Sequence, residues 1–300
     1  MRIALTGSSG LIGSTLDESL TQKGHTVVPL IRPTTRLTSN RKMIRWNPDF
    51  GHIDAAALEG FDGVIHLSGV NIAERWTPKY KSLIRESRIK STSFLSNVLA
   101  QLKNPPKAFL CASAVGIYGD SAKTKDEISL RGKDFLADVC SSWEMATEAA
   151  DHRGIRVVNM RFGVVLSKRG GMLKKILPIF KLGLGGKIGS GQQMMSWVAD
   201  EEIPFMVLHV LQTPSLRGAV NFTSPEPVSN EEFTKVLSKV LRRPAVLPVP
   251  ARVLKFMFGE MADTMLLASS NAIPKRLLES GYQFSYPALD EALAKILLSK

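Results

Sequence analysis

The sequence predicts an α/β protein built on a parallel sheet with helices on both faces. Three observations lead to this prediction. An apolar run from Met1 to Leu5 leads directly into a glycine-rich turn, and a helical pattern follows that turn. Segments typical of strands and of helices then alternate until about residue 166. Such alternation is typical of a parallel sheet that is covered on both faces.

The turn after the first strand has the composition of a nucleotide-binding loop. It reads Thr6-Gly7-Ser8-Ser9-Gly10-Leu11-Ile12-Gly13, with a glycine at every third position. Gly7 permits a tight turn, Gly10 lets a pyrophosphate approach the backbone, and Gly13 lets the helix pack close to the strand. Free N–H groups and the positive end of the helix favour a phosphate. We expect a dinucleotide site here; a purely structural turn is the alternative.

The end of the second predicted strand indicates which dinucleotide binds. This strand covers residues 25–31, and a site for NAD places Asp or Glu near its end to hold the ribose hydroxyls. No acidic residue follows before Trp46; Arg32 stands there instead, with Arg36 and Arg41 behind it. A guanidinium suits a 2′-phosphate. The predicted cofactor is NADP(H); the alternative is that these arginines only decorate a solvated loop.

A third apolar strand, at residues 63–69, ends in small residues. In a doubly wound sheet the carboxyl end of such a strand faces the cofactor, so Leu67, Ser68 and Gly69 are expected to line the crevice. His66 lies inside the apolar run, and we interpret it as a hydrogen-bonded core histidine rather than a base.

A long helix is predicted from about Pro78 to Leu102. Arg88 falls on its apolar stripe, beside Ser87 and Ser91. An unpaired guanidinium on an inward stripe is costly, so Arg88 requires an anionic partner. That partner is either a ligand or cofactor, or an internal carboxylate in a salt bridge.

The alternation of strands and helices continues beyond this helix. Strands are predicted at residues 107–112 and 155–160, and a helical pattern covers 135–146. This order predicts a Rossmann-type, doubly wound sheet over residues 1–166. Residues 167–300 are predicted to form a smaller C-terminal α/β substrate domain with a helical end, from which later segments are free to rejoin the sheet.

The character of the sequence changes after about residue 166. Residues 182–191 are too rich in glycine for regular structure, and we interpret them as a lid or substrate rim, or as a merely irregular connection. A short strand is predicted at 220–222, with helices at 230–242 and 289–298. An apolar group between these helices is interpreted as core rather than as a partner site. Its members are Met257, Phe258, Met261, Met265 and Leu266.

The composition is that of a soluble globular protein, with 44% hydrophobic residues. No run of 18 apolar residues occurs, and the first strand begins at Met1 without room for a leader peptide, so a cytoplasmic location is expected. The two cysteines, Cys111 and Cys140, are too few for a disulfide framework and too far apart for a metal site.

The formal net charge is +12 and the isoelectric point is about 9.8. Such values are typical of proteins that bind nucleic acid or anionic membranes. No basic run is interleaved with aromatic residues, so we expect no specific nucleic-acid partner and interpret the charge as an attraction for phosphorylated ligands. An unidentified small-molecule substrate is the expected partner, and the oligomeric state stays open.

Several motifs resemble the extended short-chain dehydrogenase/reductase superfamily, and within it the epimerase-like family with a C-terminal domain of unknown function. The marks, which extend over essentially the whole chain, are Arg75-Trp76-Thr77-Pro78, Ser87-Arg88, Ser113-Ala114-Val115-Gly116-Ile117-Tyr118-Gly119, Gly183-Leu184-Gly185-Gly186, Gly189-Ser190-Gly191-Gln192, Asn230-Glu231-Glu232-Phe233 and Gly259-Glu260-Met261-Ala262-Asp263. The resemblance implies a Rossmann domain that binds NADP(H). The cofactor contacts expected from the residues and the resemblance together are Gly7, Ser9, Gly10, Leu11, Ile12, Gly13, Arg32, Leu67, Ser68, Gly69, Arg88, Arg161 and Val164.

One departure from the superfamily concerns its chemistry. The usual Tyr-x-x-x-Lys, in which lysine lowers the pKa of tyrosine, is replaced by Asp138-Val139-Cys140-Ser141-Ser142-Trp143-Glu144. The candidate catalytic hydroxyls are therefore Ser113, which can donate to a carbonyl, and Tyr118; the alternative is that Tyr118 packs against the cofactor or a loop and titrates nothing. Cys140 is a further candidate, with burial as an inert residue the competing interpretation.

Two functions fit these observations. The first is an atypical NADP(H)-dependent oxidoreductase or epimerase-like enzyme, in which the nicotinamide performs the hydride chemistry. The second is a non-catalytic NADP(H)-binding protein that senses redox state or docks a partner, for which a membrane surface is one possibility. The missing Tyr-x-x-x-Lys favours the second function, and the glycine-rich rim with a large substrate domain favours the first.

Overall fold

The computed structural model describes residues 1–35 and 41–298. Within these residues one sheet has eight strands, in the order β12-β8-β6-β5-β1-β2-β3-β4. The strands are β1 (Arg2–Thr6), β2 (Thr26–Ile31), β3 (Ile44–Asn47), β4 (His52–Ile53), β5 (Gly63–His66), β6 (Ala108–Ala114), β8 (Arg156–Phe162) and β12 (Gly218–Phe222). All neighbours pair in parallel except β4, which runs antiparallel to β3. The predicted Rossmann-type parallel sheet is confirmed.

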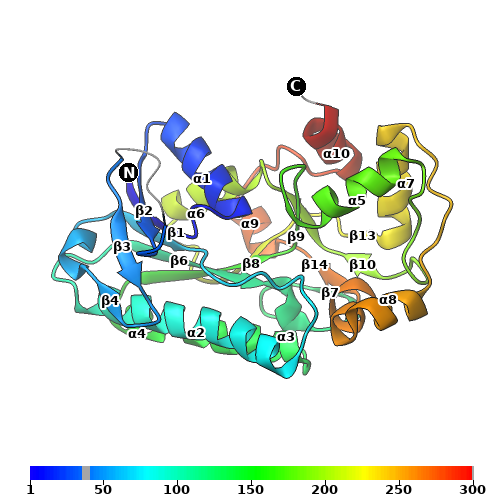
Figure 1. Cartoon of the computed structure of the whole chain (residues 1–300). Coiled ribbons are helices and arrows are strands. Elements are labelled where there is room, and N and C mark those ends of the chain that lie inside the picture. Colours follow the sequence, from blue (N-terminus) through cyan, green and yellow to red (C-terminus); the bar gives the residue numbers. More distant parts are fainter. Residues whose placement is uncertain (36–40, 299–300) are drawn as a thin grey trace.

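Helices cover both faces of this sheet (Figure 1). On one face lie α2 (Pro78–Gln101), α3 (Phe135–Met145) and α4 (Glu148–His152); on the other lie α1 (Leu11–Gln22) and α6 (Ile203–Gln212), which contact each other. The strands between them are almost continuously apolar and buried, as in Ala108–Ala114, because a sheet covered on both faces has no solvent side.

The helices begin where their sequences predict. Thr77 accepts a hydrogen bond from the N–H of Tyr80 at 3.1 Å, and Pro78 occupies the first turn. α2 therefore starts with a side-chain cap and with a residue that has no N–H in need of an acceptor. Asp134 caps α3 in the same way, with its carboxylate 2.9 Å from the N–H of Ala137. These caps fix the positions at which α2 and α3 start beside the sheet.

The chain after residue 166 both returns to the sheet and builds a second core. β12 pairs with β8, and α6 packs on α1, so these two elements belong to the sheet layers. The second core includes Leu173, Trp197, Phe233 and Leu293. It is formed by α5 (Gly171–Lys181), α7 (Asn230–Leu241), α10 (Leu289–Leu298), and the paired strands β9 (Val164–Leu166) and β11 (Trp197–Ala199).

Smaller elements complete the C-terminal part. They are β7 (Ser121–Lys125), which pairs with β14 (Ser270–Ala272); β10 (Met194–Met195), which pairs with β13 (Val228–Ser229); α8 (Ala251–Phe258); the single π-helical turn Ala262–Leu266; and α9 (Lys275–Glu279). Residues 182–191 form no helix or strand, as their glycine content predicts.

The apolar group around α8 is only partly core. Met261 is buried, and Phe258 and Leu266 pack beside it. The prediction is wrong for Met257 and Met265, which are 54% and 37% exposed. Spacing alone identified a helical apolar surface but not which of its faces the rest of the chain covers.

His66 is a core histidine, as predicted. Its ring is fully buried, with Nδ1 2.8 Å from Thr6 Oγ1 and Nε2 3.3 Å from Ser91 Oγ. Burial lowers the pKa of His66 to about 3, so the ring is neutral at physiological pH. It connects β1, β5 and α2 rather than offering a base to a ligand.

Candidate functional site

The glycine turn brings α1 into direct contact with the end of β1. Gly7 has a φ of +69°, and a Cβ at Gly7 would lie 3.0 Å from the carbonyl carbon of Leu67. A Cβ at Gly13 would lie 2.1 Å from the carbonyl oxygen of Gly7, a separation that no side chain tolerates. The structural roles predicted for these two glycines, a tight turn and close helix packing, are confirmed.

The N-terminus of α1 is open. Gly10 caps the helix without a side chain, no acidic residue occupies the first turn, and Ser9 and Gly10 are exposed. The ladder of helical bonds starts only at Ser14, whose N–H donates to Gly10 O at 2.9 Å. The preceding N–H groups, from Leu11 to Gly13, have no acceptor within the helix, and such groups commonly bind an anion.

The end of β5 adjoins this turn. β1 and β5 are neighbours in the sheet, and the N–H of Leu67 donates to Thr6 Oγ1 at 3.0 Å. Leu67 and Ser68 are half-buried and Gly69 is exposed. A Cβ at Gly69 would lie 3.3 Å from Arg88 Cζ, so the glycine gives the guanidinium room beside the strand end.

Arg88 is a mostly covered cation without a carboxylate. It donates to the carbonyl oxygens of Ile84 and Val70, each at 3.1 Å, and its guanidinium lies 5.1 Å from the ring centroid of Trp143. Burial lowers the pKa of Arg88. Within residues 1–35 and 41–298 no acidic side chain forms an ion pair with it, so the internal salt bridge considered as an alternative is wrong.

Arg32 stands at the end of β2, at the position predicted for a 2′-phosphate contact. It pairs with Asp49 at 2.7 Å, and both side chains are about half exposed, with values of 49% and 59%. Arg41 instead forms a bidentate ion pair with Asp17 and donates to Val27 O, so its guanidinium is held by internal partners. Arg36 lies outside the described residues.

A buried polar network lies at the ends of β6 and β8. Ser113 donates to Glu144 Oε1 at 2.7 Å. Arg161 donates to both carboxylate oxygens of Glu144 at 2.8 Å and, through Nη1, to Glu127 O at 3.2 Å. Burial alone would lower the pKa of Arg161, but the bonds and the charge of Glu144 raise it. The Arg161 cation is therefore fully compensated.

Tyr118 belongs to the same network. It is 5% exposed, donates its hydroxyl proton to Asn221 Oδ1 at 2.8 Å, and accepts from Arg161 Nη1 at 2.9 Å. Burial raises the pKa of Tyr118, while the charge and hydrogen bond of Arg161 oppose that rise. Its phenol is thus held protonated between two internal partners. This arrangement brings Ser113 and Tyr118 together through Glu144 and Arg161 rather than as a directly bonded pair.

The two thiols are buried. Burial raises the pKa of both Cys111 and Cys140 to about 12, so neither is a thiolate at neutral pH. This favours the interpretation of Cys140 as an inert small residue. No cluster of three or more His, Cys, Asp or Glu residues suited to a metal ion occurs in the part of the chain that the structure describes.

The segment after β9 lies against the N-terminus of α1. The N–H of Val164, the first residue of β9, donates to Ser196 O at 2.8 Å. A Cβ at Gly170 would lie 3.1 Å from Leu11 Cδ1, and Arg169 donates to Thr15 Oγ1. Arg169 also pairs with the buried Asp200 at 3.6 Å. Arg169 therefore lies close to the N-terminal part of α1.

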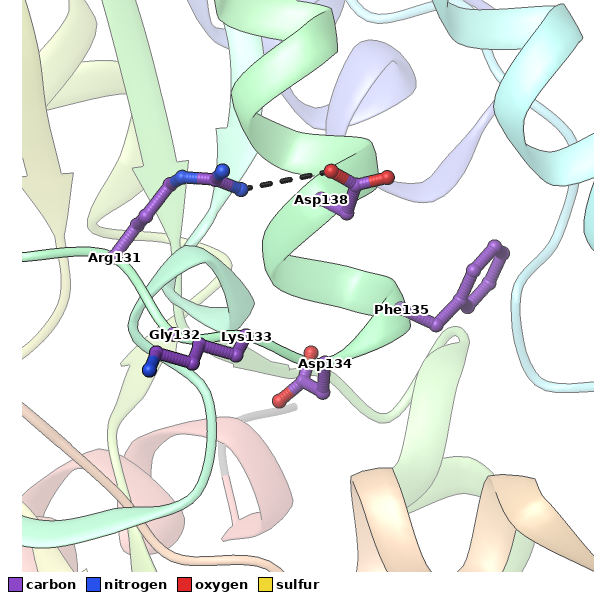
Figure 2. A pocket seen from close by; sticks show the side chains of 6 residues that line it. All are labelled: Arg131, Gly132, Lys133, Asp134, Phe135 and Asp138. Carbon is purple, nitrogen blue, oxygen red and sulfur yellow. Dashed lines mark ion pairs between the residues drawn. The ribbon is translucent and has the colours of Figure 1, made fainter.

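A pocket of about 420 Å³ opens at the start of α3 (Figure 2). It is lined by Arg131, Gly132, Lys133, Asp134, Phe135 and Asp138. Asp138 pairs with Arg131 at 3.5 Å and with Arg85, so the charges on one wall are internally matched. Glu144 lies six positions after Asp138 on α3, which corresponds to about 9 Å along the helix.

Sequence reasoning missed three residues of this region. Glu144 was noted only as a replacement in the missing Tyr-x-x-x-Lys, and no local pattern links it to Arg161. Asn221 and Arg169 carried no signal either, because each meets its partner through the fold: Asn221 and Tyr118 are 103 residues apart.

The described helices contain none that is long and apolar enough to cross a membrane. The fold and the turn define the class of protein. It is an α/β chain in which a glycine-rich turn connects β1, a central strand of the parallel sheet, to the open N-terminus of α1, the arrangement typical of dinucleotide-binding domains.

The comparisons identify the family. Residues 3–221 match the NAD dependent epimerase/dehydratase family, and residues 249–296 match a domain of unknown function, DUF1731. The chain therefore belongs to the NAD dependent epimerase/dehydratase family, as the motifs predicted. The epimerase family protein Mb2239 of Mycobacterium bovis is 42% identical over 293 residues, which cover 97% of this chain and 96% of the relative.

Solved structures agree with this assignment. The crystal structure of human epimerase family protein SDR39U1 with NADPH superposes with a TM-score of 0.89 at 31% identity and covers 100% of both chains. The UDP-glucose 4-epimerase of Thermus thermophilus, in complex with NAD, superposes with a TM-score of 0.77 at 18% identity and covers 99% of this chain and 97% of its own. The second likeness shows the fold alone.

Proposed function

We propose that the chain is an NADP(H)-dependent oxidoreductase or epimerase-like enzyme. The observation that carries the proposal is the pairing of an open helix N-terminus at Gly10 with a mostly covered Arg88 that has no acidic partner among the described residues. Both features favour an anionic ligand. The NADPH in the human relative's structure supports NADP(H) as that ligand.

The proposed cofactor contacts follow the strand ends. The pyrophosphate lies at the open N-terminus of α1, where Gly10 lets it approach, and the 2′-phosphate lies at Arg32. The half-exposed pair of Arg32 with Asp49 contributes little to stability, so it yields readily to a phosphate. The full proposed set is Gly7, Ser9, Gly10, Leu11, Ile12, Gly13, Arg32, Leu67, Ser68, Gly69, Arg88 and Val164. Arg161, which was also expected to contact the cofactor, is left out of the proposed set because its guanidinium donates to Glu144, Tyr118 and Glu127 O.

Ser113 is the proposed catalytic hydroxyl. Its single proton is donated to Glu144, which leaves the oxygen as an acceptor for a substrate hydroxyl. In alcohol oxidation the substrate O–H proton passes to Ser113 while the serine proton passes to Glu144. NADP⁺, which Gly10, Arg32 and Arg88 would hold, would supply the hydride acceptor when bound. Reduction of a carbonyl is the reverse of these transfers.

Tyr118 and Arg161 are proposed to act through the network. Both hydrogen-bonding positions of the Tyr118 hydroxyl are occupied by internal partners, so it positions Arg161, which in turn holds Glu144 under Ser113. The pocket at the start of α3 is proposed as the outer part of the substrate site. Lys133 is its exposed cation that forms no ion pair with an acidic side chain of the described residues.

A second candidate function is NADP(H) binding without turnover. It is favoured by the residues in the stretch where the superfamily has Tyr-x-x-x-Lys. There Cys140 is buried and protonated, and Glu144 is already paired with Arg161. In this function the occupied domain senses the redox state of the cofactor or docks a partner.

One set of assays separates the two functions. NADPH oxidation is followed with aldehydes, ketones and nucleotide sugars. For any substrate found, Ser113→Ala is expected to lower turnover by about a hundredfold or more with little change in NADPH affinity. Tyr118→Phe is expected to lower turnover by about tenfold without altering the pH profile, since a positioning phenol transfers no proton.

The control and the contradicting results are defined by the same assays. Cys140→Ser removes the buried thiol and is expected to leave turnover near that of the parent. Full activity in Ser113→Ala would remove Ser113 as the catalytic hydroxyl. Tight NADPH binding with no turnover across the whole screen would make the non-catalytic function the better one.

A further inference from the structure

The positive charge of the chain is concentrated in two segments. Residues 167–199 and 233–259 contain no Asp or Glu. Their Lys and Arg residues are Lys168, Arg169, Lys174, Lys175, Lys181, Lys187, Lys235, Lys239, Arg242, Arg243, Arg252 and Lys255. These twelve account for the whole net charge of +12, because the other 27 of the 39 basic residues match the 27 acidic ones. A uniformly basic surface does not have this distribution.

The fold brings the two segments together. α5 contacts α7, and the connection after α7 runs beside the glycine-rich loop. The N–H of Leu247 donates to Gly185 O at 3.0 Å, and that of Val249 donates to Lys187 O at 2.9 Å. α7, this connection and α8 lie along one end of the molecule, away from β3 and β4 (Figure 1). We call residues 179–187 and 242–257 the basic–apolar end.

Large apolar side chains are exposed over the same residues. They are Ile179, Leu182, Leu184, Val246, Leu247, Val253, Phe256 and Met257. Phe256 is 86% exposed, and Val253, Phe256 and Met257 share one face of α8 at helical spacing, while Leu254 is buried. A surface helix normally turns polar residues toward water, whereas the outer face of α8 is apolar. Such a face is typical of a helix that contacts another apolar surface.

Most of the cations beside this apolar surface form no ion pair within the described residues. Lys187 pairs with Glu231, and Lys255 pairs with Asp263. In contrast, Lys181, Arg242, Arg243 and Arg252 are exposed, and none of them forms an ion pair with an acidic side chain of the described residues. The basic–apolar end therefore combines positive charge that is unpaired within the described residues with exposed aliphatic and aromatic side chains.

We propose that the basic–apolar end binds the surface of an anionic lipid bilayer. An interfacial helix needs an apolar face that enters the acyl boundary and flanking Lys or Arg residues that meet anionic headgroups, and α8 with its neighbours provides both. Nucleic acid would use the charge but not Leu182, Val246 or Val253, since a duplex surface offers aliphatic side chains no apolar phase. The attachment is peripheral and is independent of cofactor binding.

Vesicle co-sedimentation tests this proposal with the full chain. Vesicles of phosphatidylcholine alone are compared with vesicles containing about one-third phosphatidylglycerol, at low and high salt. Binding is expected only to the anionic vesicles and is expected to weaken at high salt. Arg243→Glu/Arg252→Glu is expected to reduce the fraction bound at least about tenfold, and Phe256→Ser/Met257→Ser about as strongly.

The matched control reverses the same number of charges elsewhere. Lys42→Glu/Lys103→Glu changes two exposed lysines of the charge-balanced part and is expected to retain most of the binding. Melting temperatures verify that every variant is folded. The proposal is overturned by equal binding to both kinds of vesicle, by no binding, or by equal losses in the control and the patch variants. It is also overturned if the parent binds duplex DNA as tightly as anionic vesicles and Phe256→Ser/Met257→Ser affects neither.

Discussion

Two covered arginines near the carboxyl ends of the sheet strands differ in what surrounds them. Arg161 donates to both oxygens of Glu144, to Tyr118 and to Glu127 O, and no unmet charge remains. Arg88 has two backbone carbonyls and the face of Trp143, but no carboxylate among the described residues. Since a covered cation requires compensation, we propose that Arg161 is compensated within the chain and that a ligand compensates Arg88.

The largest expected effect is the loss of stability in Arg161→Met. Removing this guanidinium leaves Glu144, whose side chain is 14% exposed, as a nearly buried charge without its partner. Breaking such a pair costs about 3–5 kcal/mol of the free energy of unfolding. Urea unfolding without cofactor measures this loss.

Glu144→Gln provides the control for that substitution. The double variant Arg161→Met/Glu144→Gln is expected to be more stable than Arg161→Met alone, because no uncompensated carboxylate remains. A parent-like stability in Arg161→Met would contradict the structural role of Arg161.

Arg32→Ala is expected to have a smaller and more selective effect. Losing a half-exposed, charge-assisted bond to the 2′-phosphate should weaken NADPH binding about tenfold and leave NADH binding unchanged. Asp49→Asn should strengthen NADPH binding, since it releases Arg32 from a competing carboxylate. Calorimetric titration of both cofactors measures these effects, and equal losses for NADPH and NADH in Arg32→Ala would contradict the assignment.

The smallest expected effect is the change in the free energy of unfolding that Arg88→Met causes without cofactor. No carboxylate of the described residues is left unpaired when this guanidinium is removed, so the free energy of unfolding should stay within about 1 kcal/mol of the parent value. A loss of about 3 kcal/mol, as expected for Arg161→Met, would show that Arg88 is a structural cation after all.

The sequence predicted the parts of the site that depend on local order. The turn from Gly7 to Gly13 and its helix are contiguous, so spacing alone predicts the close packing at Gly13. The position of Arg88 on the inner stripe of α2 was likewise readable from helical period. The identity of its partner was not, because an acid on any other element could have reached it.

The parts that sequence reasoning missed depend on tertiary contacts. Glu144 and Arg161 lie on α3 and β8, and nothing in either segment predicts that the carboxylate reaches the guanidinium or Ser113. The outer face of α8 was misjudged for the same reason: its period predicts an apolar helix, but coverage of Met257 depends on the rest of the chain. Local patterns determine elements, and packing determines which faces meet.

The most direct test of the central claim is the stabilisation that NADPH gives to the parent and to Arg88→Met. Urea unfolding is measured with and without NADPH at about a hundred times the parent dissociation constant, where linkage predicts a gain of about 2.7 kcal/mol for the parent. Arg88→Met is predicted to keep its stability without cofactor and to lose most of that gain. A variant that retains the full gain would contradict the proposal that Arg88 binds the cofactor.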